Sequence, residues 1–452
     1  MTAVRENGGA VGVVGVGYVG LVTAACFADL GHDVVCCDVN PDRIEALRAG
    51  RVPIYEPGVE PLLQRNGPRL TFTLELADVL ERCRVVFVCV DTPPTASGDA
   101  DLSRVESVLA GIPATGARHV LVMKSTVPVG TGAKMRLELD ARGLDHIAYV
   151  ANPEFLREGR ALSDFMEPDR IVIGAFEDAD GLAVADLYAD LEAPVIRTDV
   201  ASAEMIKYGS NAFLATKISF INEIANVCEE VGADVAVVAQ GMGLDDRIGP
   251  HFLRPGIGYG GSCFPKDVHA LKQLAGNSGY HFQLLTAVIE VNELQKRRVV
   301  GKLERHLGSL RGRRIALLGL AFKANTDDMR EASSLVLAAR LKAEGADVVG
   351  YDPVAMENAR TALGDGIELA DSLLEAVTGA DAAVIVTEWG EFRHLASHAV
   401  RDAMATPLIV DGRNLLDPRQ ARDAGFAYES VGRPAYPADV VRLAGDRADA
   451  VS

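Results

Sequence analysis

The stretch Gly15-Val-Gly17-Tyr-Val-Gly20 decides the fold of the first part of the chain. An apolar run precedes it at residues 10–15, and a helical pattern of apolar residues follows from Leu21 to Leu30. A second apolar run, from residue 33 to residue 37, ends at Asp38. A G-x-G-x-x-G run between a strand and a helix, with an acidic residue after the next strand, is typical of a dinucleotide-binding βαβ unit.

Each residue of this motif has a physical task. Gly15 makes the tight turn, Gly17 lets a pyrophosphate approach the backbone, and Gly20 lets the helix pack on the strand. Asp38 would accept hydrogen bonds from the adenosine ribose and repel a 2′-phosphate, which predicts NAD rather than NADP. The alternative is a structural strand-turn-helix that binds no nucleotide.

The βα rhythm continues, and polar loops follow the next predicted strands. The runs at residues 85–90 and 119–123 lead into loops that contain Thr92 and Thr126. In doubly wound folds these loops lie on the sheet edge that binds ligands. Glu154 and Glu158 follow a strand that ends near residue 151, and residues 170–174 are expected to form the last strand of this unit. The two glutamates are either a functional pair or one solvated helix face.

A long helix is predicted from Ser202 to Val231, because this stretch lacks proline and its apolar residues recur in steps of three and four. Gly232 is a natural stop. Lys207 and Asn211 lie one turn apart on the same face. A helix of this length and apolar character favours a domain spine and a subunit interface.

A glycine-rich run from Gly256 to Asp267 carries one thiol, Cys263, beside Lys266 and Asp267. Four glycines in six residues would let a bulky ligand approach the backbone. A helix that starts near Pro265 would favour the thiolate at its N-terminus. The run therefore predicts a presented nucleophile, and the alternative is a glycine turn with a buried cysteine.

The last third repeats the βαβ pattern without the glycine fingerprint, with strands expected at residues 315–318, 347–351, 382–386 and 408–410. Lys323, Arg330 and Arg413 lie just past strand ends, which suggests phosphate recognition; solvated surface charge is the alternative for each of them. The expected fold is α/β, with two Rossmann-like doubly wound domains joined by a long central helix and a small helical region. The expected domains are residues 1–200, 201–300 and 301–452, with a tail after about residue 420 that has no assignment.

The composition excludes several classes of partner. The formal net charge of -18 argues against a nucleic-acid partner, which would need a basic face. Seven scattered cysteines indicate reduced thiols and a cytoplasmic protein. No apolar run is long enough for a membrane span, and no metal site is expected.

These segments, in this order, resemble the UDP-glucose/GDP-mannose dehydrogenase family over almost the whole chain to about residue 420. The resemblance is carried by the Gly15 to Gly20 fingerprint, Lys124-Ser-Thr126-Val-Pro-Val, Asn152-Pro-Glu154-Phe-Leu-Arg-Glu158-Gly, Glu204-Met-Ile-Lys207-Tyr-Gly-Ser-Asn211-Ala-Phe, the Gly258 to Asp267 run and Gly319-Leu-Ala-Phe-Lys323.

The resemblance implies oxidation of the C6 alcohol of UDP-glucose to UDP-glucuronate with two NAD and one water. It implies thiohemiacetal and thioester intermediates on Cys263. Lys207 and Asn211 would stabilise charge on the C6 oxygen, and Asp267 with Thr126 would hold and activate the water. Glu154 would act as general base or water-positioning acid in the hydrolytic step. How Glu154, Asp267 and Lys207 divide the proton transfers stays open. GDP-mannose or another nucleotide sugar is the alternative substrate.

The binding residues that the resemblance implies fall into two sets. Those for NAD are Gly15, Gly17, Gly20, Asp38, Arg43, Thr92, Thr126, Glu158 and, from the last domain, Arg330. Those for the nucleotide sugar are Phe155, Leu156, Arg157, Lys207, Asn211, Phe252, Arg254, Gly256, Tyr259, Gly260, Phe322, Lys323 and Arg413, with Arg247 reaching across the interface of a homodimer.

The sequence departs from the family pattern at Asp91, which stands before Thr92 where many relatives have glycine. A carboxylate there would disfavour an anionic group. Two other classes of protein compete with the resemblance. A single-step hydroxyacid dehydrogenase shares the first domain but needs no cysteine loop, and a non-catalytic nucleotide-sugar sensor needs none of the candidate catalytic side chains.

Overall fold

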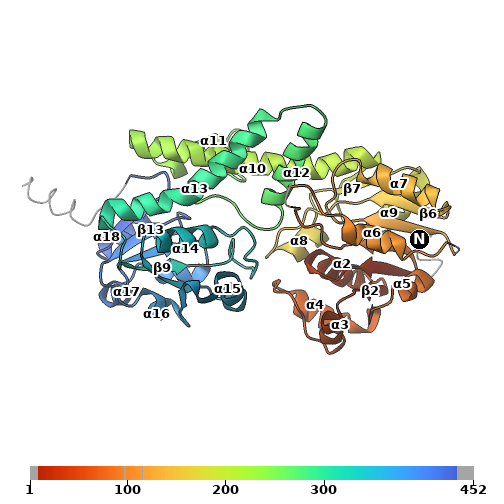
Figure 1. The fold of residues 1–452 in the computed structure, drawn as a ribbon, viewed down its shortest axis with the longest axis horizontal. Coiled ribbons are helices and arrows are strands. Elements are labelled where there is room, and N and C mark those ends of the chain that lie inside the picture. The colour runs from red at the N-terminus through yellow and green to blue at the C-terminus, as the bar shows by residue number, and fades with distance from the viewer. Residues whose placement is uncertain (1–8, 96–97, 115, 435–452) are drawn as a thin grey trace, which may run out of the picture. The chain divides into compact units, whose positions relative to one another are not determined.

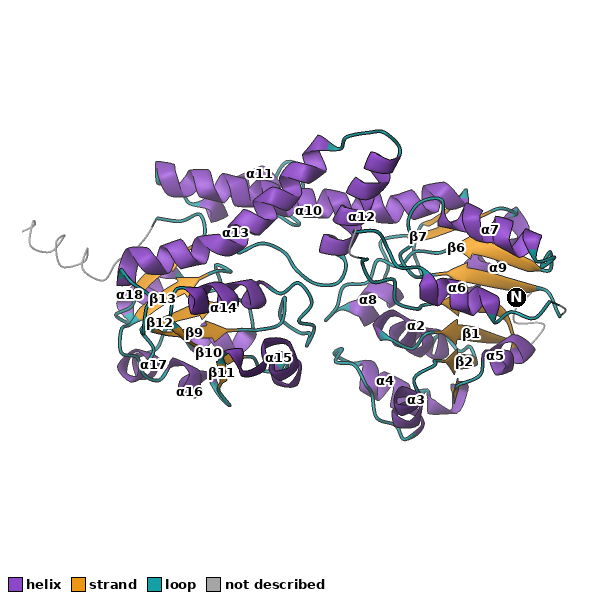
Figure 2. Ribbon diagram, in the orientation of Figure 1, coloured by secondary structure: helices purple, strands orange, loops and turns teal. Residues whose placement is uncertain are grey.

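A computed structural model describes residues 9–95, 98–114 and 116–434 (Figure 1). Its described residues divide into two compact units. The first contains residues up to 210 together with residues 269–280, and the second contains residues 211–268 and those from 281 onward. Both units are α/β, as expected (Figure 2).

The first unit is built on an eight-stranded sheet in the order β3-β2-β1-β4-β5-β6-β7-β8. All neighbouring strands are parallel except β6 and β7, which are antiparallel. The strands are β1 Ala10–Val14, β2 Val34–Cys37, β3 Leu70–Thr73, β4 Cys83–Val88, β5 His119–Met123, β6 Ile147–Ala151, β7 Ile171–Ala175 and β8 Val195–Thr198.

Helices cover both faces of this sheet, because its strands are apolar on both sides. In β5, Val120 and Val122 enter one core, whereas Leu121 and Met123 enter the other. The first core also takes residues from α2 Tyr18–Asp29, α3 Pro41–Arg48, α4 Val59–Arg65, α8 Ala161–Met166 and α9 Asp178–Ala185. The second takes residues from α5 Leu76–Arg82, α6 Ser103–Ala110 and α7 Thr131–Ala141.

Two sequence expectations for the first unit are corrected. The strand near residues 170–174 is not the last, because β8 pairs with β7 in parallel. Three of the four residues of β8 are exposed, so this strand lacks the apolar run of a buried one. Glu154 and Glu158 lie in no helix, because the chain forms a loop and a turn between β6 and α8.

Four helices lie between the two sheets in sequence: α10 Val200–Val231, α11 Val235–Gly243, α12 Phe264–Asn277 and α13 Gln283–Leu307. The predicted helix from 202 to 231 is confirmed as α10. It ends before Gly232, which has a φ of 78° that glycine adopts without steric strain. No helix in the described part of the chain is long and apolar enough to cross a membrane.

The second unit contains a six-stranded, fully parallel sheet in the order β11-β10-β9-β12-β13-β14. The strands are β9 Arg314–Leu318, β10 Asp347–Tyr351, β11 Glu368–Leu369, β12 Ala382–Ile385, β13 Leu408–Asp411 and β14 Ala427–Ser430. One core packs α13, α14 Ser333–Ala343 and α15 Met356–Leu363 on the sheet, and the other packs α16 Leu373–Val377, α17 His398–Ala403 and α18 Pro418–Asp423. Short 3-10 helices are η1 Gly67–Arg69, η2 Asp186–Tyr188, η3 Gly364–Gly366 and η4 Gly390–His394.

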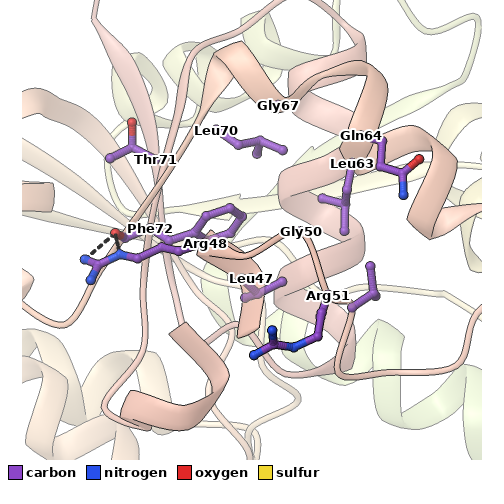
Figure 3. Close-up of a pocket in the computed structure, with 11 residues that line it drawn as sticks. Leu47, Arg48, Gly50, Arg51, Leu63, Gln64, Gly67, Leu70, Thr71 and Phe72 are labelled. Carbon is purple, nitrogen blue, oxygen red and sulfur yellow. Dashed lines mark hydrogen bonds between the residues drawn. The ribbon is translucent and has the colours of Figure 1, made fainter. Parts of the chain in front are cut away.

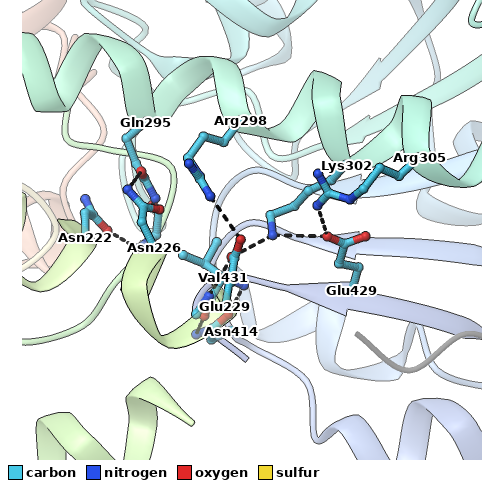
Figure 4. A network of polar contacts seen from close by, with 12 residues as sticks. Asn222, Asn226, Glu229, Gln295, Arg298, Lys302, Arg305, Asn414, Glu429 and Val431 are labelled. Atoms are coloured by element: carbon cyan, nitrogen blue, oxygen red, sulfur yellow. Dashed lines mark hydrogen bonds and ion pairs between the residues drawn. The ribbon is translucent and has the colours of Figure 1, made fainter. Parts of the chain in front are cut away.

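The stretch after residue 420, which the sequence leaves without assignment, supplies β14 and a buried ion network (Figure 4). Lys302 Nζ of α13 lies 2.6 Å from Glu229 of α10 and 3.1 Å from Glu429 of β14. Arg305 and His306 also contact Glu429, at 2.5 and 2.7 Å. Burial alone would raise the pKa of Glu429, but the hydrogen bond with His306 and the charges of Lys302 and Arg305 hold it at about 2. The network therefore fastens β14 to α10 and α13.

Candidate active site

The dinucleotide motif follows β1, and α2 begins just after Gly17. Gly15 has a φ of 89°, and a Cβ added there would lie 2.9 Å from the Cys89 carbonyl. A Cβ at Gly20 would lie 1.8 Å from the Gly15 oxygen, so the helix could not pack this closely. At Gly17 the nearest atom is 3.9 Å away, which leaves space above the N-terminus of α2. Two glycines therefore serve packing, and the third leaves the open approach that NAD phosphates need.

Asp38 follows β2 and is almost fully buried. Its Oδ2 accepts hydrogen bonds from Val16 N at 2.8 Å and Arg43 Nη1 at 3.0 Å, and its Oδ1 accepts one from Asn40 N at 2.9 Å. The carboxylate is thus fixed beside the glycine turn, and Arg43 lies against it. This arrangement fits a ribose ligand because a carboxylate has about four acceptor sites.

The loops that follow β4 and β5 are joined by Thr92 Oγ1, which donates to the Thr126 carbonyl at 2.8 Å. Both predicted threonines therefore lie at the carboxyl edge of the first sheet. Asp91 Oδ2 pairs with Arg104 Nη1 at 2.7 Å, and both side chains are exposed. Asp91, which departs from the family pattern, is thus paired with Arg104, and this cation partly offsets the negative charge of the carboxylate.

Glu158 lies in the turn before α8, and a residue that sequence reasoning missed holds that turn. Buried Glu56 accepts hydrogen bonds from the backbone N–H of Gly159 at 2.6 Å and of Ala161 at 2.8 Å, and from the Tyr18 hydroxyl. Burial and the neighbouring Glu56 raise the pKa of Tyr18 well above its usual value. Glu56 therefore fixes the Glu158 turn against the start of α2.

Lys207 and Glu154 form a buried ion pair in the first unit. Lys207 Nζ lies 2.9 Å from Glu154 Oε1, with side chains only 4% and 5% exposed. Glu154 Oε2 accepts the Leu156 N–H at 2.5 Å, and Lys207 Nζ lies 5.4 Å from the centre of the Phe155 ring. The guanidinium of Arg170 stacks 3.5 Å from that ring. The backbone of Arg157 is held by Asp164, at 2.8 Å.

A cationic residue close to this pair was quoted in the sequence only as part of a motif. Lys124 is buried, and its Nζ donates to Asn152 Oδ1 at 3.1 Å and to the Tyr188 hydroxyl at 3.2 Å. Burial lowers the pKa of Lys124 to about 8, against the opposing charge of Glu154. Lys124, Asn152, Glu154 and Tyr188 line one small cavity of about 40 Å³.

Glu204, like Lys124, was quoted in the sequence only as part of a motif and was given no role. It is buried on α10, and its two oxygens accept the backbone N–H groups of Gly130 at 2.7 Å and Gly132 at 2.8 Å. Burial raises the pKa of Glu204 to about 7, although both hydrogen bonds act to lower it. Glu204 therefore fastens α10 to the start of α7, just after the Thr126 loop.

Asn211 and Asp267 form the matching buried pair of the second unit. Asn211 Nδ2 donates to Asp267 Oδ2 at 2.6 Å. Lys266 Nζ lies 2.8 Å from Asp267 Oδ1 and forms an ion pair with it, but the geometry is not that of a hydrogen bond. Lys207 and Asn211 lie one turn apart on α10, and each contacts one of the two predicted catalytic carboxylates: Lys207 contacts Glu154, and Asn211 contacts Asp267.

Cys263 directly precedes α12, whose first residue is Phe264, and Asp267 N donates to the Cys263 carbonyl at 2.8 Å. Ser262 Oγ lies 3.6 Å from its sulfur. Cys263 is half-buried, whereas the other six cysteines are buried. Burial raises the pKa of all six, to about 11 for Cys37 and about 12 for Cys26, Cys83 and Cys89. The thiol with the best access therefore lies at a helix N-terminus.

The glycines of this loop serve packing more than the sequence suggested. A Cβ at Gly258 would lie 2.7 Å from Asn292, one at Gly260 would lie 2.2 Å from the Glu331 carbonyl, and one at Gly261 would enter the Phe322 ring. Protein atoms, not an open ligand space, fill these positions. The expectation that the missing Cβ atoms admit a ligand is wrong at these three residues.

The remaining predicted nucleotide-sugar residues lie in the second unit, where several cations already have partners. Lys323 Nζ lies 5.2 Å from the centre of the Phe322 ring. Arg413 is half-buried and donates to three carbonyls, among them that of Gly258 at 3.1 Å. Arg330 pairs with Asp328 at 2.7 Å. The others are half-buried Phe252, with a φ of 62°, exposed Arg254, and exposed Arg247, which pairs with Asp245 at 2.6 Å.

One further cavity of the first unit, of about 430 Å³, contains none of the predicted residues (Figure 3). It lies among α3, α4 and edge strand β3, where Arg48 donates to the Phe72 carbonyl. Within the described residues, no group of three or more His, Cys, Asp or Glu side chains could hold a metal ion.

Three family models cover most of the chain. Residues 9–192 match the NAD binding domain of the UDP-glucose/GDP-mannose dehydrogenase family, residues 201–294 its central domain and residues 316–418 its UDP binding domain. The first domain is therefore an NAD binding domain, as the glycine turn and Asp38 predicted. The boundaries near residues 200 and 300 remain predictions.

Relatives match over nearly their whole length. UDP-glucose 6-dehydrogenase TuaD of Bacillus subtilis is 46% identical over 94% of this chain and 93% of its own, and the Pseudomonas aeruginosa UDP-glucose 6-dehydrogenase is 46% identical over 93% and 97%. The structure of a UDP-glucose dehydrogenase from Pyrobaculum islandicum aligns with a TM-score of 0.86 and 40% identity, over 94% of this chain and 98% of that one. The glycine turn, the two buried carboxylate pairs and the thiol before α12 thus occur in a chain that belongs to the UDP-glucose/GDP-mannose dehydrogenase family.

Proposed function

We propose that this chain is a UDP-glucose 6-dehydrogenase that converts the C6 alcohol of UDP-glucose to the carboxylate of UDP-glucuronate. The observation that carries the proposal is the placement of Cys263. It is the one half-buried cysteine among the described residues, it precedes α12, and Asp267 of the same helix bonds Asn211. A full oxidation of an alcohol to an acid uses such a nucleophile, because the intermediate aldehyde gives up a second hydride only after a nucleophile has added to its carbonyl carbon.

Two NAD molecules, one for each oxidation, supply the hydride acceptors when bound. Glu154 takes the proton of the C6 hydroxyl while Lys207 stabilises the charge on its oxygen, since the two side chains lie 2.9 Å apart. Loss of the first hydride from C6 leaves the aldehyde. The sulfur of Cys263 then adds to the aldehyde carbon, the C=O π bond breaks, and the carbonyl oxygen takes a proton to give a thiohemiacetal. Loss of the second hydride leaves a thioester. Water attacks the thioester carbon, the C–S bond breaks, and the thiolate of Cys263 returns.

Asp267 and Thr126 are proposed to hold that water, and Asn211 to bond the C6 oxygen. The direct support is the Asn211–Asp267 hydrogen bond, which orients both groups from buried positions. Within the NAD binding domain, Gly15, Gly17, Gly20, Asp38 and Arg43 are proposed for the adenosine half, and Thr92, Thr126 and Glu158, with Arg330, for the other half. Phe155, Leu156, Arg157, Phe252, Arg254, Gly256, Tyr259, Gly260, Phe322, Lys323 and Arg413 are proposed for the nucleotide sugar.

A homodimer is proposed because α10 exposes an apolar stripe. Phe213, Phe220 and Val227 recur every seven residues and are 65%, 50% and 57% exposed. A seven-residue apolar repeat on a helix suits another helix packed along it. A second copy of the chain would cover the stripe and would bring its Arg247 to the sugar-nucleotide site. The cytoplasmic location stays a prediction.

The test is the yield of NADH from a limiting amount of UDP-glucose. Two NADH per sugar are expected, and one NADH per sugar would contradict the proposal. GDP-mannose and UDP-N-acetylmannosamine, assayed side by side, decide the substrate, because GDP-mannose 6-dehydrogenase is the alternative function. Sedimentation of the purified chain measures the dimer separately.

A further inference from the structure

The segment Gly256–Cys263, called here the cysteine loop, has its backbone carbonyls bonded to side chains of the second unit. Four consecutive carbonyls, those of residues 256–259, each accept one such bond. The donors, in order, are Gln295 at 2.9 Å, Ser333 at 3.2 Å, Arg413 at 3.1 Å and Asn292 at 3.1 Å. Donors thus reach the loop from α13, from α14 and from the chain after β13.

Two side-chain amides, those of Asn222 and Asn292, also accept hydrogen bonds from N–H groups of this segment. Asn222 and Gln295 are labelled in Figure 4. Asn292 takes both backbone groups of Tyr259, accepting its N–H at 2.8 Å and donating to its carbonyl. Asn222 on α10 accepts the Gly256 N–H at 2.8 Å, opposite the Gln295 bond to the Gly256 carbonyl. The exposed fractions of Asn222, Asn292 and Gln295 are 0%, 3% and 2%. Both polar atoms of Asn292 and of Gln295 are bonded, and buried amides bonded in this way fix a backbone rigidly. The Nδ2 of Asn222 has no hydrogen-bond partner among the described residues.

The fixed backbone is connected to the thiol by aromatic packing. The ring of Tyr259 meets the ring of Phe264 edge-on, with centroids 5.9 Å apart. Phe252 packs against the same Phe264 ring at 6.2 Å. Phe264 directly follows Cys263 and is the first residue of α12. Whatever holds Tyr259 therefore also holds Cys263 at the start of that helix.

The backbone of the cysteine loop is bonded within the protein through both its carbonyls and its N–H groups. The carbonyls of residues 256–259 each accept one bond from a side chain, and the N–H groups of Gly256, Tyr259 and Gly261 each donate to a protein acceptor. A backbone N–H donates one bond, so these three groups are committed to the protein.

We propose that Asn222, Asn292 and Gln295 are positioning residues for the oxidation: they hold the cysteine loop so that Cys263 stays at the N-terminus of α12. This inference rests on the proposed function. Each of the three amides bonds the loop backbone, and Gln295 also accepts a hydrogen bond from Asn226 at 3.2 Å, so they act on Cys263 through the loop.

The experiment compares Asn292→Ala with Val299→Ala in the full-length protein. Val299 lies two turns further along α13 on the same face and is buried in the core that also contains Ile257. Its side chain is apolar, so its truncation lowers stability and removes no hydrogen bond to the loop. The readouts are the pH profile of Cys263 alkylation by iodoacetamide, followed by mass spectrometry, and the kcat and KM for UDP-glucose. Gln295→Leu, which removes the bond to the Gly256 carbonyl, is the second variant should Asn292→Ala not fold.

Asn292→Ala is expected to move the alkylation profile to higher pH and to raise KM about tenfold, because two loop bonds are lost. Val299→Ala should leave the profile in place and KM within about twofold, since its effect is on stability alone. If Asn292→Ala and Gln295→Leu lower stability as Val299→Ala does but leave both readouts unchanged, the positioning role is refuted. A wild-type protein that does not oxidise UDP-glucose would refute the proposed function instead, and the alkylation profile would still decide the loop.

Discussion

Lys207 Nζ and Glu154 Oε1 lie 2.9 Å apart, in side chains that are only 4% and 5% exposed. The pair joins α10 to the loop after β6, and Lys207 also lies over the Phe155 ring. Lys207→Met would leave a carboxylate buried without its cation. We expect a loss of about 3–5 kcal/mol of unfolding free energy, because breaking a buried pair leaves an uncompensated charge.

The double variant Lys207→Met/Glu154→Gln should recover most of that stability while activity stays lost. Urea denaturation of the two single variants and the double variant gives the coupling between the residues. If the two single effects simply add, the ion pair does not contribute as a pair. Lys134→Met, which removes an exposed lysine paired with Glu106, is the control and should change stability by less than about 0.5 kcal/mol.

Cys263 should be the cysteine that native protein exposes to alkylation. Iodoacetamide at pH 8 is expected to label Cys263 and to leave the six buried thiols unlabelled, since burial raises the pKa of each. Peptide mass spectrometry identifies the labelled residue. Cys263→Ser should lower the rate of complete oxidation at least about a thousandfold while UDP binding by calorimetry stays unchanged. Labelling of Cys89 at the same rate would contradict this account.

The strands most readily predicted were those with continuous apolar runs after clear loops, such as β5, whose limits agree with the expectation. The strand β8 was missed because its residues are exposed and include Arg197, so it has neither an apolar run nor an alternation. The edge strand β14 was missed because its Glu429 is stabilised only by α13 cations that lie more than a hundred residues away in sequence.

The residues of the candidate site also fall into two groups, those that the sequence could identify and those that only the fold reveals. The acidic end of β2, the thiol before α12 and the lysine of α10 belong to local motifs, so the sequence could identify them. Asn292 and Glu204 sit on helices, where an amide or a carboxylate most often indicates a solvated position. Their partners are backbone N–H and carbonyl groups of distant loops, which only the fold brings to them. A sequence pattern carries no signal for such contacts.

Lys124 predicts a pH dependence of stability. Its pKa falls from 10.5 to about 8 on folding, so between these values the unfolded chain binds more protons than the native one. Stability attributable to Lys124 therefore rises as pH increases from about 8 to 10.5 and is lowest below pH 8. Lys124→Met should gain up to about 3 kcal/mol at pH 7 and nothing above pH 10.5, as measured by denaturation at each pH. A gain of the same size at every pH would show that the lowered pKa of Lys124 is not the cause of the gain.

Glu429 predicts a dependence of the same sign at acidic pH, because its pKa is also lowered on folding. Because its native pKa is about 2 rather than 4.5, its contribution is present above pH 4.5 and is lost as pH falls toward 2. Glu429→Gln should lower stability by about 3 kcal/mol at pH 7, and the difference from wild type should vanish near pH 2. Glu368→Gln, in an exposed pair with Arg314, is the control and should change stability by less than about 1 kcal/mol. Equal effects of the two substitutions would show that the buried network adds nothing.

Asp38 and Arg43 predict how the choice of dinucleotide can be changed. In the native protein Arg43 Nη1 donates to Asp38 at 3.0 Å. Asp38→Ala removes the acceptor for ribose hydroxyls and frees the guanidinium, which then suits a 2′-phosphate. The ratio of NAD to NADP affinity should fall at least about tenfold, measured by calorimetric titration of each dinucleotide without substrate. Asp42→Ala, an exposed acid in the first turn of α3, is the matched control and should keep the wild-type ratio. An unchanged ratio in Asp38→Ala would mean that another residue excludes NADP.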